Sequence, residues 1–224
     1  MLESTPPNPD MSLLEADACD PAQASHTITA LLNIASQNSG RLNAILDPDI
    51  LLNNVIPLLK EGFDLYYVHV YLLDEDSRLL RLKAGYGDAG REMLERGHSI
   101  PLVQAQSLNA RAARTRQVVV ENDVRSNPAW LPNPLLPDTR SEGAFPMVVG
   151  DTVLGVFDVQ HNQQDYFTQD YVDVFFSLAG QIATALQNAR YVEQIAANLQ
   201  QTQSRLEIGQ AFAGAETQSD VARA

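Results

Sequence analysis

Residues 139–160, TRSEGAFPMVVGDTVLGVFDVQ, hold two short runs rich in Val, Phe, Leu and Met. Gly150 and Asp151 separate the runs, and a short glycine-containing turn between two β-prone runs predicts a β-hairpin. In the second run, Val153, Phe157 and Val159 are an even number of residues apart, so in a strand they would point to the same face. We therefore expect that face of the strand to be more apolar than the other. We place this hairpin at the far wall of a β-sheet.

The segments around the hairpin alternate between helical and extended patterns. Asp47 and Pro48 form a helix-start signal, with Asp as the N-cap and Pro in the first turn, and Gly62 closes that helix. Ser107 is expected to cap a later helix. The predicted order is a helix from about Ser25, a helix at 48–62 containing Pro57, strands at 65–73 and 78–84, a glycine-punctuated loop, a short helix at 91–96, an extended segment at 100–102, a helix at 108–114, a strand at 118–120, the hairpin and a long helix. This order implies an α+β fold, an antiparallel sheet of five to six strands with helices packed on it.

Residues 122–138, NDVRSNPAWLPNPLLPD, contain four prolines and are expected to form neither a helix nor a central strand. We call this segment the lid, because long loops within a compact domain tend to be functional. It carries Trp130, the only tryptophan in the chain. Trp130 either closes over a ligand or anchors the loop to the domain body.

The apolar face of the long helix after the hairpin becomes narrower along the helix. A broad apolar face runs from Val172 to Leu186, and a seam at spacings of three and four follows it. The seam consists of Val192, Ile195, Leu199, Thr202 and Leu206. This change predicts a helix that leaves the domain as a coiled coil. We therefore divide the chain into a disordered acidic tail at 1–24, a domain at 25–190 and a signalling helix at 191–224, which could also begin a following module.

Charge and composition exclude several classes of partner. The net charge is −13 and no run of Lys or Arg occurs, so binding to nucleic acid or to an anionic membrane surface is not expected. No apolar run approaches the roughly 20 residues that span a bilayer. A cytoplasmic location is the expectation. One cysteine and four scattered histidines predict neither a disulfide nor a metal site, and no cofactor is expected.

The sequence resembles the GAF domain, a small-molecule-sensing module of bacterial signalling proteins. The resemblance spans residues 25–192, and the segments that carry it are 100–102 (IPL), 112–114 (AAR), 120–124 (VENDV), 139–142 (TRSE), 145–147 (FPM), 150–156 (GDTVLGV), 158–160 (DVQ), Phe167 with Asp170, 179–183 (AGQIA) and 186–190 (LQNAR). It implies a sensory or regulatory role in signal transduction, such as a two-component system, with a histidine kinase or cyclase domain as a possible downstream partner.

Departures from the family narrow the function. Covalent bilin attachment within such a domain uses a cysteine there, whereas the cysteine of this chain is Cys19, in the predicted tail. GAF enzymes that reduce free methionine sulfoxide need an attacking and a resolving thiol. No assembled nucleophile, base or metal cluster is visible either. We therefore expect a module that is not an enzyme.

The candidate ligand-binding residues are Tyr67, His69, Trp130, Arg140, Ser141 and Phe145. His69 lies in an apolar strand beside Tyr67 and could line a pocket or ligate haem iron, or be an ordinary sheet-face histidine. Arg140 and Ser141 could meet an anionic ligand or could hold the loop. His98 and His161 are next to turn residues and are expected to be solvated.

Two functions remain open at this stage. In the first, a small-molecule effector binds between the sheet and the lid, and the change leaves through the flanking helices. In the second, the chain is a structural dimerisation or protein-interaction module whose core is filled by its own side chains, Trp130 and Phe145 among them. Both involve a homodimer joined by the first and last helices. A cavity with converging polar groups would separate them.

Overall fold

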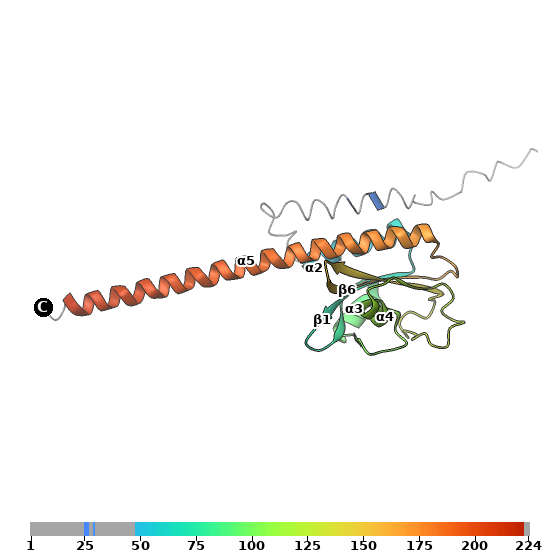
Figure 1. Ribbon diagram of the computed structural model, residues 1–224, viewed down its shortest axis with the longest axis horizontal. Helices are drawn as coiled ribbons and strands as arrows, with labels where there is room; N and C mark the ends of the chain where they lie inside the picture. The colour runs from blue at the N-terminus through green and yellow to red at the C-terminus, as the bar shows by residue number, and fades with distance from the viewer. Residues whose placement is uncertain (1–24, 27–28, 30–47, 222–224) are drawn as a thin grey trace, which may run out of the picture.

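The computed structural model describes residues 25–26, 29 and 48–221. The predicted acidic tail and most of the predicted first helix fall outside these residues. The sheet has six antiparallel strands: β1 (Tyr67–Asp74), β2 (Leu79–Gly85), β3 (Ser99–Pro101), β4 (Val119–Glu121), β5 (Ser141–Val149) and β6 (Thr152–His161). Their order is β3-β2-β1-β6-β5-β4. Figure 1 shows the whole chain, with β1 and β6 labelled in the sheet. The predicted α+β fold is therefore confirmed.

The β5–β6 hairpin does not form the far wall of the sheet, as the sequence suggested. Strand β6 lies in the middle and pairs with β1 as well as with β5. The pairing of β1 with β6 joins segments far apart in the chain, for example Val68 with Val159. Short-range sequence patterns carry no information on such pairing. As a result, the side chains of β6 are central to both faces of the sheet.

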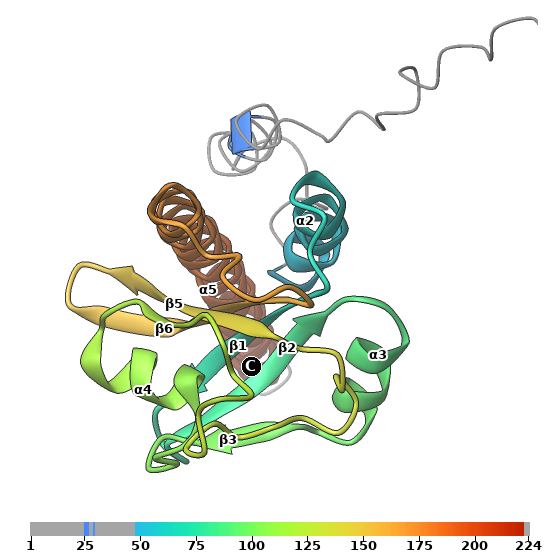
Figure 2. The ribbon, with the colours of Figure 1, turned by 90° about the vertical axis from the view of Figure 1, so that its right-hand side faces the viewer.

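Helices cover the sheet on both sides (Figure 2). Helices α2 (Pro48–Gly62) and α5 (Gln169–Val221) lie on one face, which we call the helix face. Helices α3 (Gly87–Glu95) and α4 (Leu108–Thr115) lie on the other, together with the lid; we call this the lid face. Each face has its own apolar core cluster. Strand β6 is consequently buried on both sides, because neither face is left to solvent.

A β-bulge corrects the predicted alternation within the hairpin. The register shifts between Met147 and Val148. Val153 therefore joins Val156 in the lid-face core, whereas Leu154 joins Phe157 in the helix-face core. A strict period of two would have placed Val153 and Phe157 together. An extra residue in one strand reverses the facing of all residues beyond it.

Local signals in the sequence account for most helix ends. Helix α2 begins at Pro48 and ends at Gly62 as predicted, and it runs through Pro57. Ser107 caps α4, its Oγ accepting a hydrogen bond from the backbone N–H of Ala110 at 3.2 Å. Helix α3 begins at Gly87, before the predicted 91–96. Gly90 packs on Gly85 so closely that an added Cβ would lie 2.3 Å from the Gly85 carbonyl carbon, so glycine here permits close packing and does not mark a loop.

Helix α5 is continuous over 53 residues. Its first part packs on the sheet through Phe175, Ile182 and Leu186, which are fully buried. Further along, Ile195 and Leu199 of the predicted seam are 59% and 60% exposed, so these two side chains are not buried against the described part of this chain. Among the described residues, no helix is long and apolar enough to cross a membrane.

Candidate functional site

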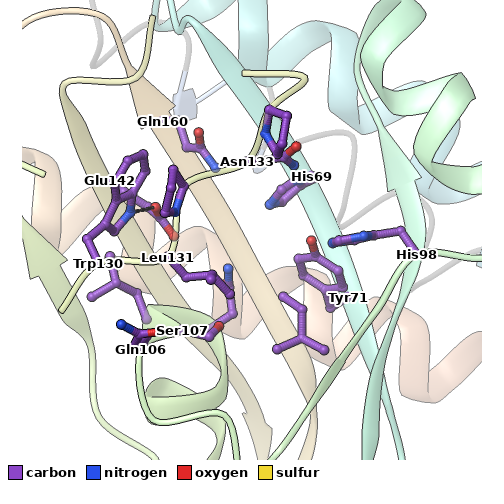
Figure 3. A pocket seen from close by; sticks show the side chains of 15 residues that line it. His69, Tyr71, His98, Gln106, Ser107, Trp130, Leu131, Asn133, Glu142 and Gln160 are labelled. Atoms are coloured by element: carbon purple, nitrogen blue, oxygen red, sulfur yellow. Dashed lines mark hydrogen bonds between the residues drawn. The ribbon is translucent and has the colours of Figure 1, made fainter. Parts of the chain in front are cut away.

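A cavity of about 180 Å³ lies between the lid face of the sheet and the lid (Figure 3). Strands β1, β5 and β6 form its floor, the start of α4 forms one wall and the lid covers it. Its lining residues are His69, Tyr71, His98, Ile100, Gln106, Ser107, Leu108, Asn109, Trp130, Leu131, Pro132, Asn133, Pro134, Glu142 and Gln160. The prolines that exclude regular structure from the lid thus also shape the roof of the cavity.

A buried carboxylate, that of Asp158 of β6, lies beside the cavity in contact with residues that line it. It is fully buried, with Nε2 of His69 3.1 Å from its Oδ1. The two atoms are within ion-pair distance of each other. The side-chain amides of Gln160, at 3.1 Å, and of Asn109 donate to its oxygens. Burial acts to raise the pKa of Asp158, but the charge of His69 and the hydrogen bonds from neighbours outweigh it and leave the pKa below its usual value. Asp158 is therefore an anion inside the fold.

Glu142 of β5 is a second buried acid, 6% exposed, and it lines the cavity. Ala144 pairs with Asp158 and Glu142 with Gln160 across the strands, so Glu142 and Asp158 are diagonal neighbours on the same face. The indole N–H of Trp130 donates to Oε2 of Glu142 at 2.6 Å. Burial, and then the nearby charge of Asp158, raise the pKa of Glu142 well above its usual range.

Three polar atoms of two lining residues have no hydrogen-bond partner: Nδ1 and Nε2 of His69 and Oδ1 of Asn109. Both side chains are more than nine-tenths buried, at 2% and 4% exposed. The amide nitrogen of Asn109 donates to Asp158, so its oxygen is the atom left over. Because buried polar groups are nearly always paired, unpaired atoms on two residues beside one cavity indicate a place where a ligand or water supplies a missing partner.

A second hollow, of about 440 Å³, lies on the helix face. It is lined by exposed charged side chains that already form ion pairs, Lys83 with Asp49 at 2.7 Å and Arg81 with Asp74 at 2.9 Å. None of the unpartnered buried atoms in the described part of the chain lines it. The cavity on the lid face is therefore the better candidate site.

The structure brings together only some of the residues that the sequence proposed. His69 and Trp130 line the cavity. Tyr67 does not, but its ring lies edge-on to His69 at 5.0 Å. Arg140 is exposed and outside the lining. Ser141 is buried and donates to the carbonyl of Gln163 at 2.8 Å, so it holds a loop.

Phe145 was placed wrongly among the ligand candidates. It lies in the helix-face core, where its ring centroid is 5.6 Å from that of Phe175, on the side of the sheet away from the cavity. The prediction that His98 and His161 are solvated was also wrong. His98 lines the cavity, and burial followed by the charge of His69 lowers its pKa. His161 is 4% exposed and stacks on Tyr166 at 3.9 Å.

Sequence reasoning missed the acids and amides that define the site: Glu142, Asp158, Asn109 and Gln160. A signal was present, because Asp158 stands between Phe157 and Val159 in a run that is otherwise apolar. A carboxylate at such a position is rarely buried without partners. Two of its partners, His69 and Asn109, come from β1 and α4, which no local pattern connects to the hairpin.

The chain belongs to the GAF domain family, whose family model matches residues 46–187. Among solved structures it is similar to the GAF domain of a phosphoenolpyruvate-protein phosphotransferase from Coxiella burnetii (TM-score 0.64, 16% identity, covering 79% of this chain and 98% of that one). It is also similar to a putative GAF sensor protein from Burkholderia vietnamiensis (0.60, 21%, 76% and 98%). A third similar structure is a free methionine-R-sulfoxide reductase from Neisseria meningitidis in complex with its substrate (0.61, 20%, 76% and 92%). These identities establish a shared fold. No curated protein matched the sequence.

Proposed function

We propose that this chain is a sensory GAF module that binds a small molecule under the lid and transmits the binding event through α5. The carrying observation is the cavity of about 180 Å³ with unpartnered buried atoms of His69 and Asn109 at its wall. A ligand donor or acceptor at this place would satisfy groups that otherwise destabilise the fold by about 1–3 kcal/mol each.

The same observation weighs against the alternative, a purely structural dimerisation or interaction module. Such a module would fill the space between sheet and lid with its own side chains. Phe145, which the alternative needs for that filling, lies on the opposite face of the sheet. Trp130 combines both roles considered for it, since it anchors the lid to Glu142 and also lines the cavity.

We propose a binding role and not catalysis, although sulfoxide reductases share the fold. Residues 46–187 contain no cysteine. Reduction of a sulfoxide by protein thiols needs a thiolate that attacks and a thiol that resolves the intermediate. The matched domain therefore has the fold of those enzymes without the sulfur atoms that their reaction requires.

A set of hydrogen bonds supplies a route from lid to output helix. Asn122, where the lid begins, accepts from the backbone N–H of Phe167 at 3.0 Å and donates to the Phe167 carbonyl at 3.1 Å. The Asn122 carbonyl accepts from the N–H of Asp165 at 2.9 Å. Helix α5 begins at Gln169, two residues further on. A shift of the lid root is thereby passed to the first turn of α5.

The output in this proposal is a homodimer joined through α5 and the first helix, with a downstream kinase or cyclase as the effector. The exposed seam residues Ile195 and Leu199 support an apolar contact between two copies of α5. A ligand that favours one arrangement of the two helices shifts the population toward it by its differential affinity.

Native mass spectrometry of freshly purified full-length protein tests the binding role. We expect an additional mass that disappears on denaturation and is reduced in Asn109→Leu, which removes an unpartnered wall atom. Asp151→Asn, in the exposed hairpin turn, is the matched control and should retain the mass. A clean apo mass from several expression hosts would favour the structural alternative.

A further inference from the structure

We propose that the cavity takes a compact organic cation, whose protonated amine lies against Glu142 and Asn109 and which carries no acidic group. This inference rests on the proposed function and names the ligand class of the same site. It follows from the charges that line the cavity, the hydrogen-bonding atoms left free there, and the aromatic residues around them.

The strongly charged groups of the site are acids, and its basic side chains are the histidines His69 and His98. The lining residues include Glu142 but no lysine or arginine. Asp158, an anion, lies beside the cavity, with His69 as its basic contact. An anionic ligand, such as a phosphate or a carboxylate, would be brought close to two buried acids without a guanidinium or ammonium partner, which is strongly unfavourable in a site of low dielectric constant.

The free hydrogen-bonding atoms match a group that donates several bonds. Oδ1 of Asn109 can only accept. In the free protein the protonated Glu142 is hydrogen-bonded to Asp158. Once ionised, the Glu142 carboxylate accepts at both oxygens, of which Trp130 contacts Oε2. An alkylammonium group carries three N–H donors and no acceptor, so its bonding capacity is complementary to this wall.

The remaining surface suits the body of such a ligand. Trp130 and Tyr71 present aromatic rings, which attract cations held near their faces. Ile100, Leu108 and Leu131 provide apolar contact. The volume of about 180 Å³ is below the roughly 300–1,000 Å³ of pockets for drug-sized ligands, so the ligand is compact.

Binding of a cation in this position is coupled to proton release from Glu142. The groups facing Glu142 are Asp158 and Gln160 from β6, Trp130 from the lid, His69 and Tyr71 from β1, Glu121 from β4, and His98 from the turn before β3. Burial and Asp158 favour the protonated acid in the free protein. An ammonium group favours the carboxylate, so its affinity increases as pH rises, while an aliphatic amine remains charged.

Fluorescence of Trp130, the only tryptophan, provides a readout located at the site. We would titrate the full chain with four probes of one size: n-butylammonium chloride, n-butanol, butyramide and sodium butyrate. The ammonium probe should change the fluorescence at concentrations at least about tenfold lower than the other three. Glu142→Gln should weaken its binding by about tenfold or more, and Asp151→Asn should leave it unchanged.

The wild-type protein gives a second test that does not depend on the folding of a variant. Calorimetry in two buffers of different ionisation enthalpy should reveal proton release on binding of n-butylammonium, and the affinity should rise from mildly acidic to mildly alkaline pH. Binding of butanol, butyramide or butyrate as tightly as the amine would overturn the cation assignment and leave the proposed site intact. No response to any probe, together with no co-purified mass, would overturn the proposed function as well.

Discussion

The indole nitrogen of Trp130 lies 2.6 Å from Oε2 of Glu142, so a single hydrogen bond joins the middle of the lid to strand β5. The acceptor is a carboxyl that is 6% exposed. The position of the lid and the protonation state of Glu142 are therefore linked. A change in one must appear in the other.

Replacing Trp130 with Phe should loosen the lid. The substitution keeps an aromatic ring but removes the N–H, leaving Glu142 without its donor. We expect a decrease of about 1–3 kcal/mol in the free energy of unfolding, measured by urea denaturation followed by circular dichroism. If Trp130→Phe and Glu142→Gln have fully additive effects in a double-mutant cycle, the bond is not energetically coupled.

The pH dependence of stability should carry the signature of Glu142. Its pKa is raised in the folded state, so the folded protein holds a proton that the unfolded chain releases at about pH 4.3. The stability from this group is fully present below that pH and is lost as pH rises through the raised pKa, at up to about 1.4 kcal/mol per pH unit. The wild-type minus Glu142→Gln difference in unfolding free energy should therefore fall with pH.

Asp158 should act in the opposite direction and at lower pH. Its pKa is below its usual value, so its contribution is present above about pH 3.9 and is lost as pH falls through the lowered pKa. The two acids thus separate into different pH windows. A difference curve for Glu142→Gln that is flat above about pH 4.3 would contradict the assignment of a raised pKa to Glu142.

Asn122→Ala should uncouple the lid root from α5. It removes both side-chain bonds to the backbone of Phe167. Hydrogen–deuterium exchange should accelerate in residues 165–175, with ligand or probe affinity changed less than about threefold, since Asn122 does not line the cavity. Ser126→Ala, which removes a local bond to Asp123 within the lid, is the control. Equal acceleration in both variants would argue against a specific link.

Two glycines should respond oppositely to alanine. At Gly155, in the centre of the sheet, an added Cβ would lie 2.0 Å from the carbonyl oxygen of Tyr71. Gly155→Ala should therefore lower the free energy of unfolding by about 3 kcal/mol. At Gly180, in α5, nothing lies within 4 Å of the added carbon. Gly180→Ala should raise the melting temperature, by the equivalent of about 0.5–1 kcal/mol. Thermal unfolding of the two variants tests the central position of β6.

The role of α5 in dimerisation is tested by truncation after Asn188 and by Leu199→Asp. Either change should reduce the mass in light scattering to that of a monomer, because a charge at an apolar seam position opposes helix association. Gln201→Asp, two residues away and off the seam, should retain the dimer. An unchanged oligomeric mass after truncation would remove α5 beyond Asn188 from the interface.

The sequence predicted elements whose causes are local. The start of α2 at Pro48, the Ser107 cap of α4 and the proline-rich lid each depend on neighbours within a few residues. The alternation in β2 likewise matches its burial pattern. These features arise from backbone geometry that one or two side chains decide, so a single sequence is sufficient to find them.

The site was harder to predict because its parts meet only through long-range pairing. Glu142 and Asp158 become neighbours through the β5–β6 register, and Asn109 reaches Asp158 only because α4 packs on that face. Carboxylates in a strand usually indicate a solvent-facing side. The prediction that Phe145 lines the ligand site failed for a related reason. The face on which a strand residue lies depends on the register and on the position of any bulge.

The length of α5 has a mechanical consequence. At about 1.5 Å per residue, its 53 residues extend roughly 80 Å, and most of the part beyond Arg190 has no contact with the sheet. Such a rod acts as a lever whose short arm rests on the domain. A tilt of about 5° at its base moves its far end by roughly 7 Å. A displacement beside Phe167 too small to alter the domain would therefore be amplified, at the far end, to more than the pitch of one helical turn.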